Sequence, residues 1–238
     1  MFKISVITPS VRSEGLKLVE KALKRQTFKD FEWIIVGNVP DTSITFPFTY
    51  LKDPEKQEGD VWVLNKAYNK AIRHAQGELI VSWQDWTYAK PDTLERFYQH
   101  FLDEPKTLVG AVGNKYQDEE WAVVTWQDPR ITTEHGTYYP VYFSDIEWNL
   151  ASIPKQAIYD VGGFDEYLDK WYGMDAYSVN ARIHLLGGYD FKLDQTIKSY
   201  SLEHGRLTKD WEEKNAIHGP YQERSKEYIK NPTLTYLG

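Results

Sequence analysis

The sequence predicts an α/β fold in which a mostly parallel central sheet is covered by helices on both faces. Three observations predict it. Short apolar runs alternate with segments of helical periodicity, the first such run lies near the amino terminus, and 41% of the 238 residues are hydrophobic, which is enough for a full core. Ligands of such sheets bind beyond the carboxyl ends of the strands. The polar residues that follow the predicted strands are therefore the first candidates for a site.

The amino-terminal half alternates predicted strands and helices. Apolar runs predict strands at 3–10, 31–36, 48–51 and 78–83. Apolar residues at helical spacing predict helices that begin near 16 and 64, and Gly77 is expected to stop the second helix. The polar residues just beyond the strands lie at 8–13, 37–38 and 84–86.

The carboxyl-terminal half carries the most informative motif, the run GGFDE at 162–166 followed by WYGMD at 171–175. Paired glycines let a backbone approach a ligand closely, and aromatic faces suit sugar rings. Asp175 opens a predicted helix, whose backbone donors hold a carboxylate ionised, as a general base requires. An ordinary Gly-Gly turn with Asp175 as a plain N-cap is the alternative.

The order and spacing of these pieces resemble the inverting glycosyltransferases of family 2, which have the GT-A fold. The matching segments are 5–10 (SVITPS), 26–36 (QTFKDFEWIIV), 67–80 (AYNKAIRHAQGELI), 91–95 (PDTLE), 162–166 and 173–175. The resemblance implies a Rossmann-like sheet of the GT-A type. We expect a GT-A domain at 1–206, with a nucleotide-sugar half at 1–90 and an acceptor half at 91–206, and a polar helical tail at 207–238.

The resemblance implies transfer of a sugar from a nucleoside diphosphate sugar, with a UDP-sugar favoured, to an acceptor hydroxyl, with inversion and with Asp175 as general base. The implied donor-binding residues are Thr8, Pro9, Ser10, Asn38, Gln84, Asp85, Trp86, Gly162 and Gly163. The implied acceptor-binding residues are Asp165, Trp171 and Tyr172. Asp165 alternatively caps the turn that follows it. Asn38 stands where many members have Asp, which leaves the base open. A non-catalytic nucleotide-sugar or glycan-binding module of the same fold is the alternative function.

The metal motif departs from the family pattern. Gln84-Asp85-Trp86 stands where the family has Asp-x-Asp, so only Asp85 keeps a carboxylate for the Mn²⁺ or Mg²⁺ that the resemblance implies on the diphosphate. His204 is the implied second ligand, and a His satisfied by hydrogen bonds is the alternative reading. Without a metal, Arg206, Lys209 or another cation has to neutralise the leaving diphosphate.

Composition bounds the partners. The chain has 28 Lys and Arg against 35 Asp and Glu, and 28 − 35 = −7, which disfavours non-specific binding to nucleic acid or anionic lipid. It has no cysteine, which excludes disulfides and thiolate metal sites. Because no apolar run reaches about 18 residues, we expect a cytoplasmic protein without a transmembrane segment, peripheral to a membrane only through its acceptor. That acceptor stays open among a glycan, a lipid-linked sugar and other hydroxyl compounds.

Overall fold

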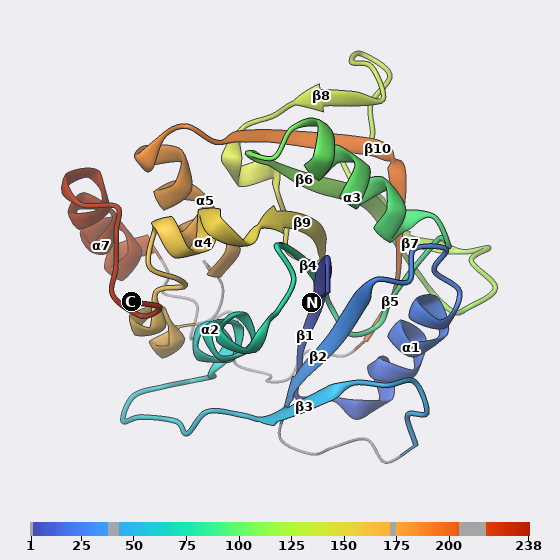
Figure 1. Ribbon diagram of the computed structural model, residues 1–238, viewed down its shortest axis with the longest axis horizontal. Helices are drawn as coiled ribbons and strands as arrows, with labels where there is room; N and C mark the ends of the chain where they lie inside the picture. The colour runs from blue at the N-terminus through green and yellow to red at the C-terminus, as the bar shows by residue number, and fades with distance from the viewer. Residues whose placement is uncertain (1, 38–42, 172–174, 205–217) are drawn as a thin grey trace.

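The structure, a computed structural model, describes residues 2–37, 43–171, 175–204 and 218–238. Its centre is a ten-stranded sheet with the order β3-β2-β1-β4-β9-β6-β10-β5, with β7 paired to β6 and β8 paired to β10 (Figure 1). The strands are β1 (Ile4–Ser10), β2 (Phe31–Gly37), β3 (Thr49–Lys52), β4 (Leu79–Trp83), β5 (Thr87–Ala89), β6 (Thr107–Tyr116), β7 (Val124–Trp126), β8 (Tyr138–Pro140), β9 (Leu150–Pro154) and β10 (Asp190–Leu202).

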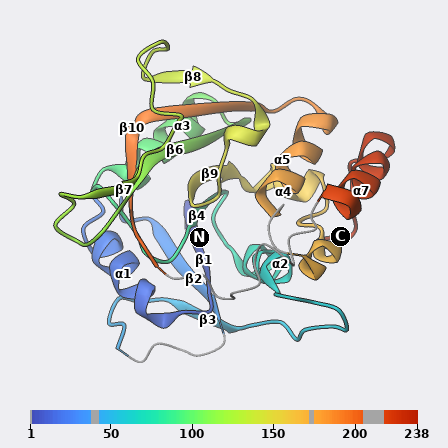
Figure 2. The ribbon, with the colours of Figure 1, turned by 180° about the vertical axis from the view of Figure 1, so that it is seen from behind.

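Helices cover both faces of the sheet, α1 and α3 on one face and α2, α4 and α5 on the other (Figures 1 and 2). The α-helices are α1 (Leu16–Lys24), α2 (Leu64–His74), α3 (Thr93–Asp103), α4 (Lys155–Asp160), α5 (Asp175–Leu186) and α7 (His218–Lys230). The 3-10 helices are η1 (Ser13–Gly15), η2 (Phe143–Asp145) and η3 (Glu166–Lys170).

The strands bury both of their faces because apolar residues run through them without a polar alternation. In β1, Val6 packs into the core on the α1 and α3 side, while Ile7 packs into the core on the α2 side. In β2, Ile35 packs on the α1 and α3 side, and Ile34 packs on the α2 side. A sheet whose central strands are apolar on both faces needs helices on both faces, as the sequence predicted.

The mostly parallel character of the sheet is also confirmed. Strands β3, β2, β1 and β4 are parallel, and β6 is parallel to β10. Strand β9 is antiparallel to both β4 and β6, so these two groups run in the same direction. Their carboxyl ends therefore lie at one edge, where α/β sheets bind ligands.

The helix predicted from residue 64 ends at His74, three residues before Gly77, which was expected to stop it. A Cβ added at Gly77 would lie 2.5 Å from the backbone nitrogen of Ser5. Gly77 therefore serves a close approach to β1 as the chain enters β4.

The described part of the predicted tail packs against the rest of the domain. Helix α7 contacts α5, and its Tyr228 is only 1% exposed (Figure 1). Beyond it, the Leu234 N–H donates to the Val161 carbonyl at 3.0 Å, and the Leu237 N–H donates to the Gly162 carbonyl at 3.0 Å. Residues 218–238 thus contribute to the folded core.

None of the helices in the described ranges combines the length and the hydropathy that a bilayer crossing needs.

Candidate functional site

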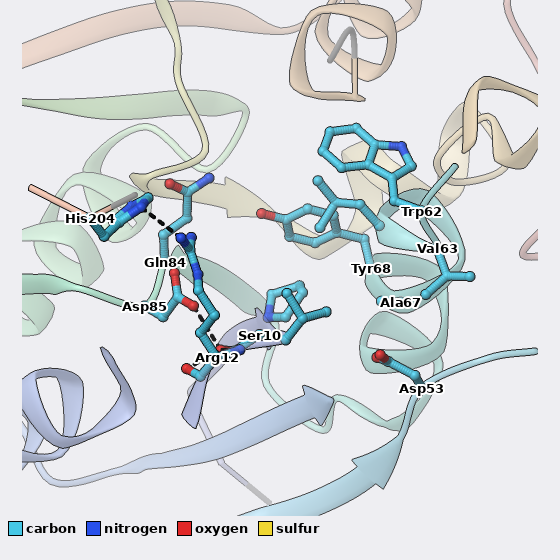
Figure 3. Close-up of a pocket in the computed structure, with 13 residues that line it drawn as sticks. Ser10, Arg12, Asp53, Trp62, Val63, Ala67, Tyr68, Gln84, Asp85 and His204 are labelled. Carbon is cyan, nitrogen blue, oxygen red and sulfur yellow. Dashed lines mark hydrogen bonds between the residues drawn. The ribbon is translucent and has the colours of Figure 1, made fainter. Parts of the chain in front are cut away.

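A cavity of about 200 Å³ opens at the carboxyl ends of β1 and β4 (Figure 3). Residues 9–12 at the end of β1, Gln84 and Asp85 after β4, and His204 after β10 line one part of it. The rest is lined by Asp53, which follows β3, and by Trp62, Val63, Leu64, Ala67 and Tyr68 at the start of α2. The sheet topology thus brings together segments that are far apart in the sequence.

Asp85 is the acidic centre of this cavity. The Ser10 hydroxyl donates to Asp85 Oδ2 at 2.7 Å. Burial raises the pKa of the Asp85 carboxyl, while the hydrogen bond from Ser10 and the charge of Arg12 oppose that rise. Since those partners favour the charged form, they hold a carboxylate at the carboxyl end of β4.

Arg12 reaches across the cavity to His204, with its Nη1 2.8 Å from His204 Nδ1 (Figure 3). A guanidinium only donates, so Nδ1 accepts and the proton of the neutral ring is on Nε2. In this arrangement neither ring nitrogen offers a lone pair to a metal. Over the residues that the structure describes, no group of three or more His, Cys, Asp or Glu side chains could hold a metal ion. Asp85 and His204 as placed therefore do not form a ready metal site.

Tyr68 lines the cavity from helix α2. Its ring stacks on Phe164, with centroids 4.5 Å apart and planes 8° apart. Its hydroxyl lies 3.2 Å from Ser82 Oγ, and Ser82 in turn donates to the Trp148 carbonyl. Burial raises the pKa of the Tyr68 hydroxyl, and the negative charges of Asp175 and Asp85 raise it further. The Tyr68 hydroxyl therefore stays protonated and lies within electrostatic reach of both carboxylates.

A second hollow, of about 380 Å³, shares Gln84 with the first cavity. Asp175 lines it from the first residue of α5, together with the side chains of Lys115, Glu147 and Tyr177. Burial raises the pKa of the Asp175 carboxyl, while backbone hydrogen bonds at the start of α5 oppose the rise. A half-buried carboxyl with a raised pKa at a hollow is suited to take a proton.

Comparison with protein-family models and with curated protein sequences gave no match. Solved structures match in fold. S. aureus TarS 1-349 in complex with UDP aligns with a TM-score of 0.63 at 16% identity, over 85% of this chain and 61% of that chain. The complex with UDP-GlcNAc aligns with a TM-score of 0.64 at 15% identity, over 86% and 60% of the two chains. GalNAc-T7 with UDP, GalNAc and Mn²⁺ aligns with a TM-score of 0.63 at 9% identity, over 86% and 44%.

The fold is that of the GT-A glycosyltransferases. At these identities the likeness concerns the fold. The chain spans at most 61% of the length of these three structures. In this GT-A fold, the cavity described above lies at the sheet edge where the sequence placed the donor.

Several donor residues named from the sequence do line the cavity, namely Pro9, Ser10, Gln84 and Asp85. Thr8 does not line the cavity. It is fully buried, and its hydroxyl accepts a hydrogen bond from Trp33 Nε1 at 3.0 Å. Thr8 thus lies inside the protein, two residues before the end of β1.

Trp86 is not among the residues that line the cavity. Its backbone has φ 59°, and its N–H donates to the Gly15 carbonyl at 3.2 Å. A Cβ at Gly15 would come within 2.4 Å of the indole, so the ring packs directly on that glycine. The centroid of the Trp86 ring is 5.9 Å from that of the His204 ring. Trp86 therefore supports His204 and the loop that carries Asp85.

The paired glycines are occupied by the carboxyl-terminal segment. Gly162 and Gly163 have φ of 71° and 94°. A Cβ on Gly162 would lie 1.6 Å from the Leu234 carbonyl oxygen, and one on Gly163 would lie 2.7 Å from the Leu237 side chain. These glycines admit protein backbone and side chains, not an open cavity, so we leave them out of the proposed donor site.

Asp165 is fully buried and already has donors for both carboxylate oxygens. Its side chain caps η3 by accepting from the Tyr167 N–H at 3.2 Å, which was the alternative reading. It also accepts from Arg224 Nε at 2.9 Å and from the Tyr228 hydroxyl. No oxygen of Asp165 is left for a sugar, so it too stays outside the proposed site.

Trp171 packs its ring against Tyr167, with centroids 5.3 Å apart. Asn38, Tyr172, Arg206 and Lys209 lie outside the described residues.

Sequence reasoning included Arg12 only within the polar run 8–13 after the first strand, and it assigned no site role to Asp53, Tyr68 and Glu147, which also line the two hollows. Arg12 and Asp53 each follow a strand, β1 and β3, at the ligand-binding edge, which was an available signal. Tyr68 matched the apolar face of α2 and was therefore read as core. Nothing local marks Glu147.

Proposed function

We propose that this chain is an inverting glycosyltransferase of the family 2 type, which moves a sugar from a UDP-sugar to an acceptor hydroxyl. One observation carries the proposal. The cavity that holds Asp85 and the hollow that holds Asp175 meet at Gln84, and the Tyr68 hydroxyl lies within electrostatic reach of both carboxylates. A donor in one hollow and an acceptor in the other would bring the reacting atoms together between them.

The cavity supplies what a nucleoside diphosphate needs. Arg12 places a guanidinium beside Asp85, and guanidinium groups bind phosphate oxygens strongly. The solved structures of the same fold contain UDP or UDP-GlcNAc, which favours a UDP-sugar as donor. A divalent cation on the diphosphate is the expectation from the family resemblance and from the Mn²⁺ of GalNAc-T7, but the contact of Arg12 with His204 favours the Arg12 guanidinium as the group that meets the diphosphate charge. Because His204 is engaged by Arg12, we assign no step to a metal.

The reaction follows from this arrangement. The acceptor oxygen attacks the anomeric carbon and forms the new C–O bond while the bond from that carbon to the diphosphate oxygen breaks. Its proton passes to the Asp175 carboxylate, and the electron pair of the broken bond leaves with UDP. Arg12 meets the charge that develops on the departing diphosphate. Attack opposite the leaving group inverts the configuration at the anomeric carbon.

A binding module without catalysis is the alternative for the same fold. The position of Asp175 favours the enzyme. It is the first residue of α5, it faces a hollow next to the donor cavity, and its pKa is raised toward the range of a working base. A module that only binds a sugar needs no such carboxyl there.

The test is turnover of a panel of UDP-sugars by wild type, Asp175→Asn and Glu147→Gln. Asp175 and Glu147 both line the second hollow, where we place the acceptor, so Glu147→Gln is the matched carboxyl control. We expect Asp175→Asn to lower kcat about a hundredfold or more with UDP affinity nearly unchanged, because removal of a general base costs that much. A greater loss in Glu147→Gln than in Asp175→Asn would move the base to Glu147. Release of no nucleotide by a wild-type protein that binds UDP would favour the module.

A further inference from the structure

The far end of the donor cavity holds the buried carboxylate of Asp53. Asp53 follows β3 directly, lines the cavity and is 9% exposed. Among the residues that the structure describes, none gives a hydrogen bond to its Oδ2. A buried polar atom without a partner costs free energy, and a ligand that supplies a donor removes that cost.

The backbone fixes Asp53 in place. Its N–H donates to the Gly37 carbonyl at 2.8 Å, and the Tyr50 hydroxyl donates to the same oxygen at 2.9 Å. Gly37 is itself pressed against β1, since a Cβ there would lie 2.5 Å from the Ser10 carbonyl oxygen. The backbone of Asp53 is therefore anchored to the end of β2, which packs against β1. These bonds do not use the carboxylate oxygens, so the carboxylate is a preorganised acceptor.

The surroundings of Asp53 suit a flat, mostly apolar ring. Asp53 lies at the opposite end of the cavity from Asp85, Arg12 and His204, and the apolar residues Val63 and Ala67 also line the cavity (Figure 3). A diphosphate belongs at the end that holds the guanidinium. The other end of the same nucleotide, its base, then falls at Asp53.

Building on the proposed function, we propose that Asp53 Oδ2 accepts the N3–H of the donor's uracil and so selects the base. Uracil, thymine and guanine carry a hydrogen on the ring nitrogen of this edge. Cytosine and adenine present a lone pair there, which a carboxylate repels. A cavity of about 200 Å³ that also holds a diphosphate favours the single ring of uracil over guanine.

The test compares UDP with UDP methylated at N3, by calorimetry, on wild type, Asp53→Ala and Glu55→Gln. Glu55 is an exposed carboxyl two residues away and serves as the control. A hydrogen bond to a charged group contributes about 1.5–3 kcal/mol, or about ten- to a hundredfold in affinity. We expect methylation to weaken binding to wild type and to Glu55→Gln by that factor. Asp53→Ala should bind UDP more weakly by a similar factor, and methylation should then cost little more. Thermal unfolding checks that the variant is folded.

Three outcomes would overturn the inference. Full UDP affinity in Asp53→Ala would leave the proposed function standing and remove the role of Asp53. An equal cost of methylation in wild type and Asp53→Ala would show that the methyl group clashes elsewhere. CDP binding as tightly as UDP would show that the carboxylate does not select uracil. Failure of the folded wild type to bind any of these nucleotides would instead contradict both proposals together.

Discussion

Replacing Asp165 by Ala should loosen the carboxyl-terminal helix from the domain. The buried carboxylate accepts from Arg224 Nε at 2.9 Å, Arg224 Nη2 at 3.2 Å and the Tyr236 hydroxyl at 3.3 Å, and also from the Tyr228 hydroxyl. These donors all lie in the carboxyl-terminal segment, whereas Asp165 precedes η3. One carboxylate thus joins two parts of the chain, and its removal leaves all of these donors without their acceptor.

The magnitude follows from the burial of the partners. Removing one member of a buried ion pair costs about 3–5 kcal/mol. The Arg224 side chain is 23% exposed and regains some hydration, which puts the loss at the lower end, about 3 kcal/mol. For a chain of this length each kcal/mol shifts Tm by about 2–4 °C, so we expect Tm to fall by about 6–12 °C.

Thermal and urea unfolding followed by circular dichroism would measure this change, with Glu227→Gln as control. Glu227 also pairs with Arg224, at 2.8 Å, but its side chain is 67% exposed, so its loss should cost no more than about 1 kcal/mol. Limited proteolysis should cleave Asp165→Ala first near α7. A loss in Asp165→Ala no greater than that in Glu227→Gln would refute the argument that this carboxylate anchors the helix.

Two further predictions concern the charges of the site. Because the Arg12 guanidinium lies at His204, where a metal would otherwise bind, calorimetry should show that EDTA changes the wild-type affinity for UDP less than about threefold. In the same EDTA buffer, Arg12→Gln should lower the affinity for UDP about tenfold or more. Binding by wild type only in the presence of Mn²⁺ would show that a metal displaces Arg12. For pH, burial raises the pKa of Asp175, and the base works deprotonated, so kcat/KM should fall on the acid side with a midpoint above the ordinary Asp value of about 4. A profile without that acid limb, measured where the protein stays folded, would remove Asp175 as the base.

The parts of the fold that the sequence predicted are those encoded locally. Strands β1, β2 and β4 are apolar runs bounded by turn residues, so a short window suffices to find them. The place of β9 between β4 and β6 depends on pairing between distant segments, for example Ile80 with Ile153, and no local pattern encodes it.

The site divides in the same way. Asp85 and Ser10 were found because each stands at the end of a recognisable strand. No local pattern distinguished Thr8 from Ser10, because β1 buries both of its faces and the two residues share the same alternation. The sequence could not show whether Asp165 binds a sugar or pairs within the protein, because its partner Arg224 lies 59 positions away. Arg12 and His204 are 192 positions apart, and only the folded sheet brings them together.

Inversion by an Asp175 base is tested by the anomeric configuration of the sugar that wild type releases from UDP-sugars, followed by NMR from the first turnovers. With water or a simple alcohol as acceptor, we expect free UDP together with a sugar whose anomeric configuration is opposite to that of the donor. We also expect Asp175→Asn to lower this rate about a hundredfold. Release of a sugar with the donor's own configuration would rule out inversion, and a folded protein that binds UDP yet turns over no UDP-sugar would rule out catalysis.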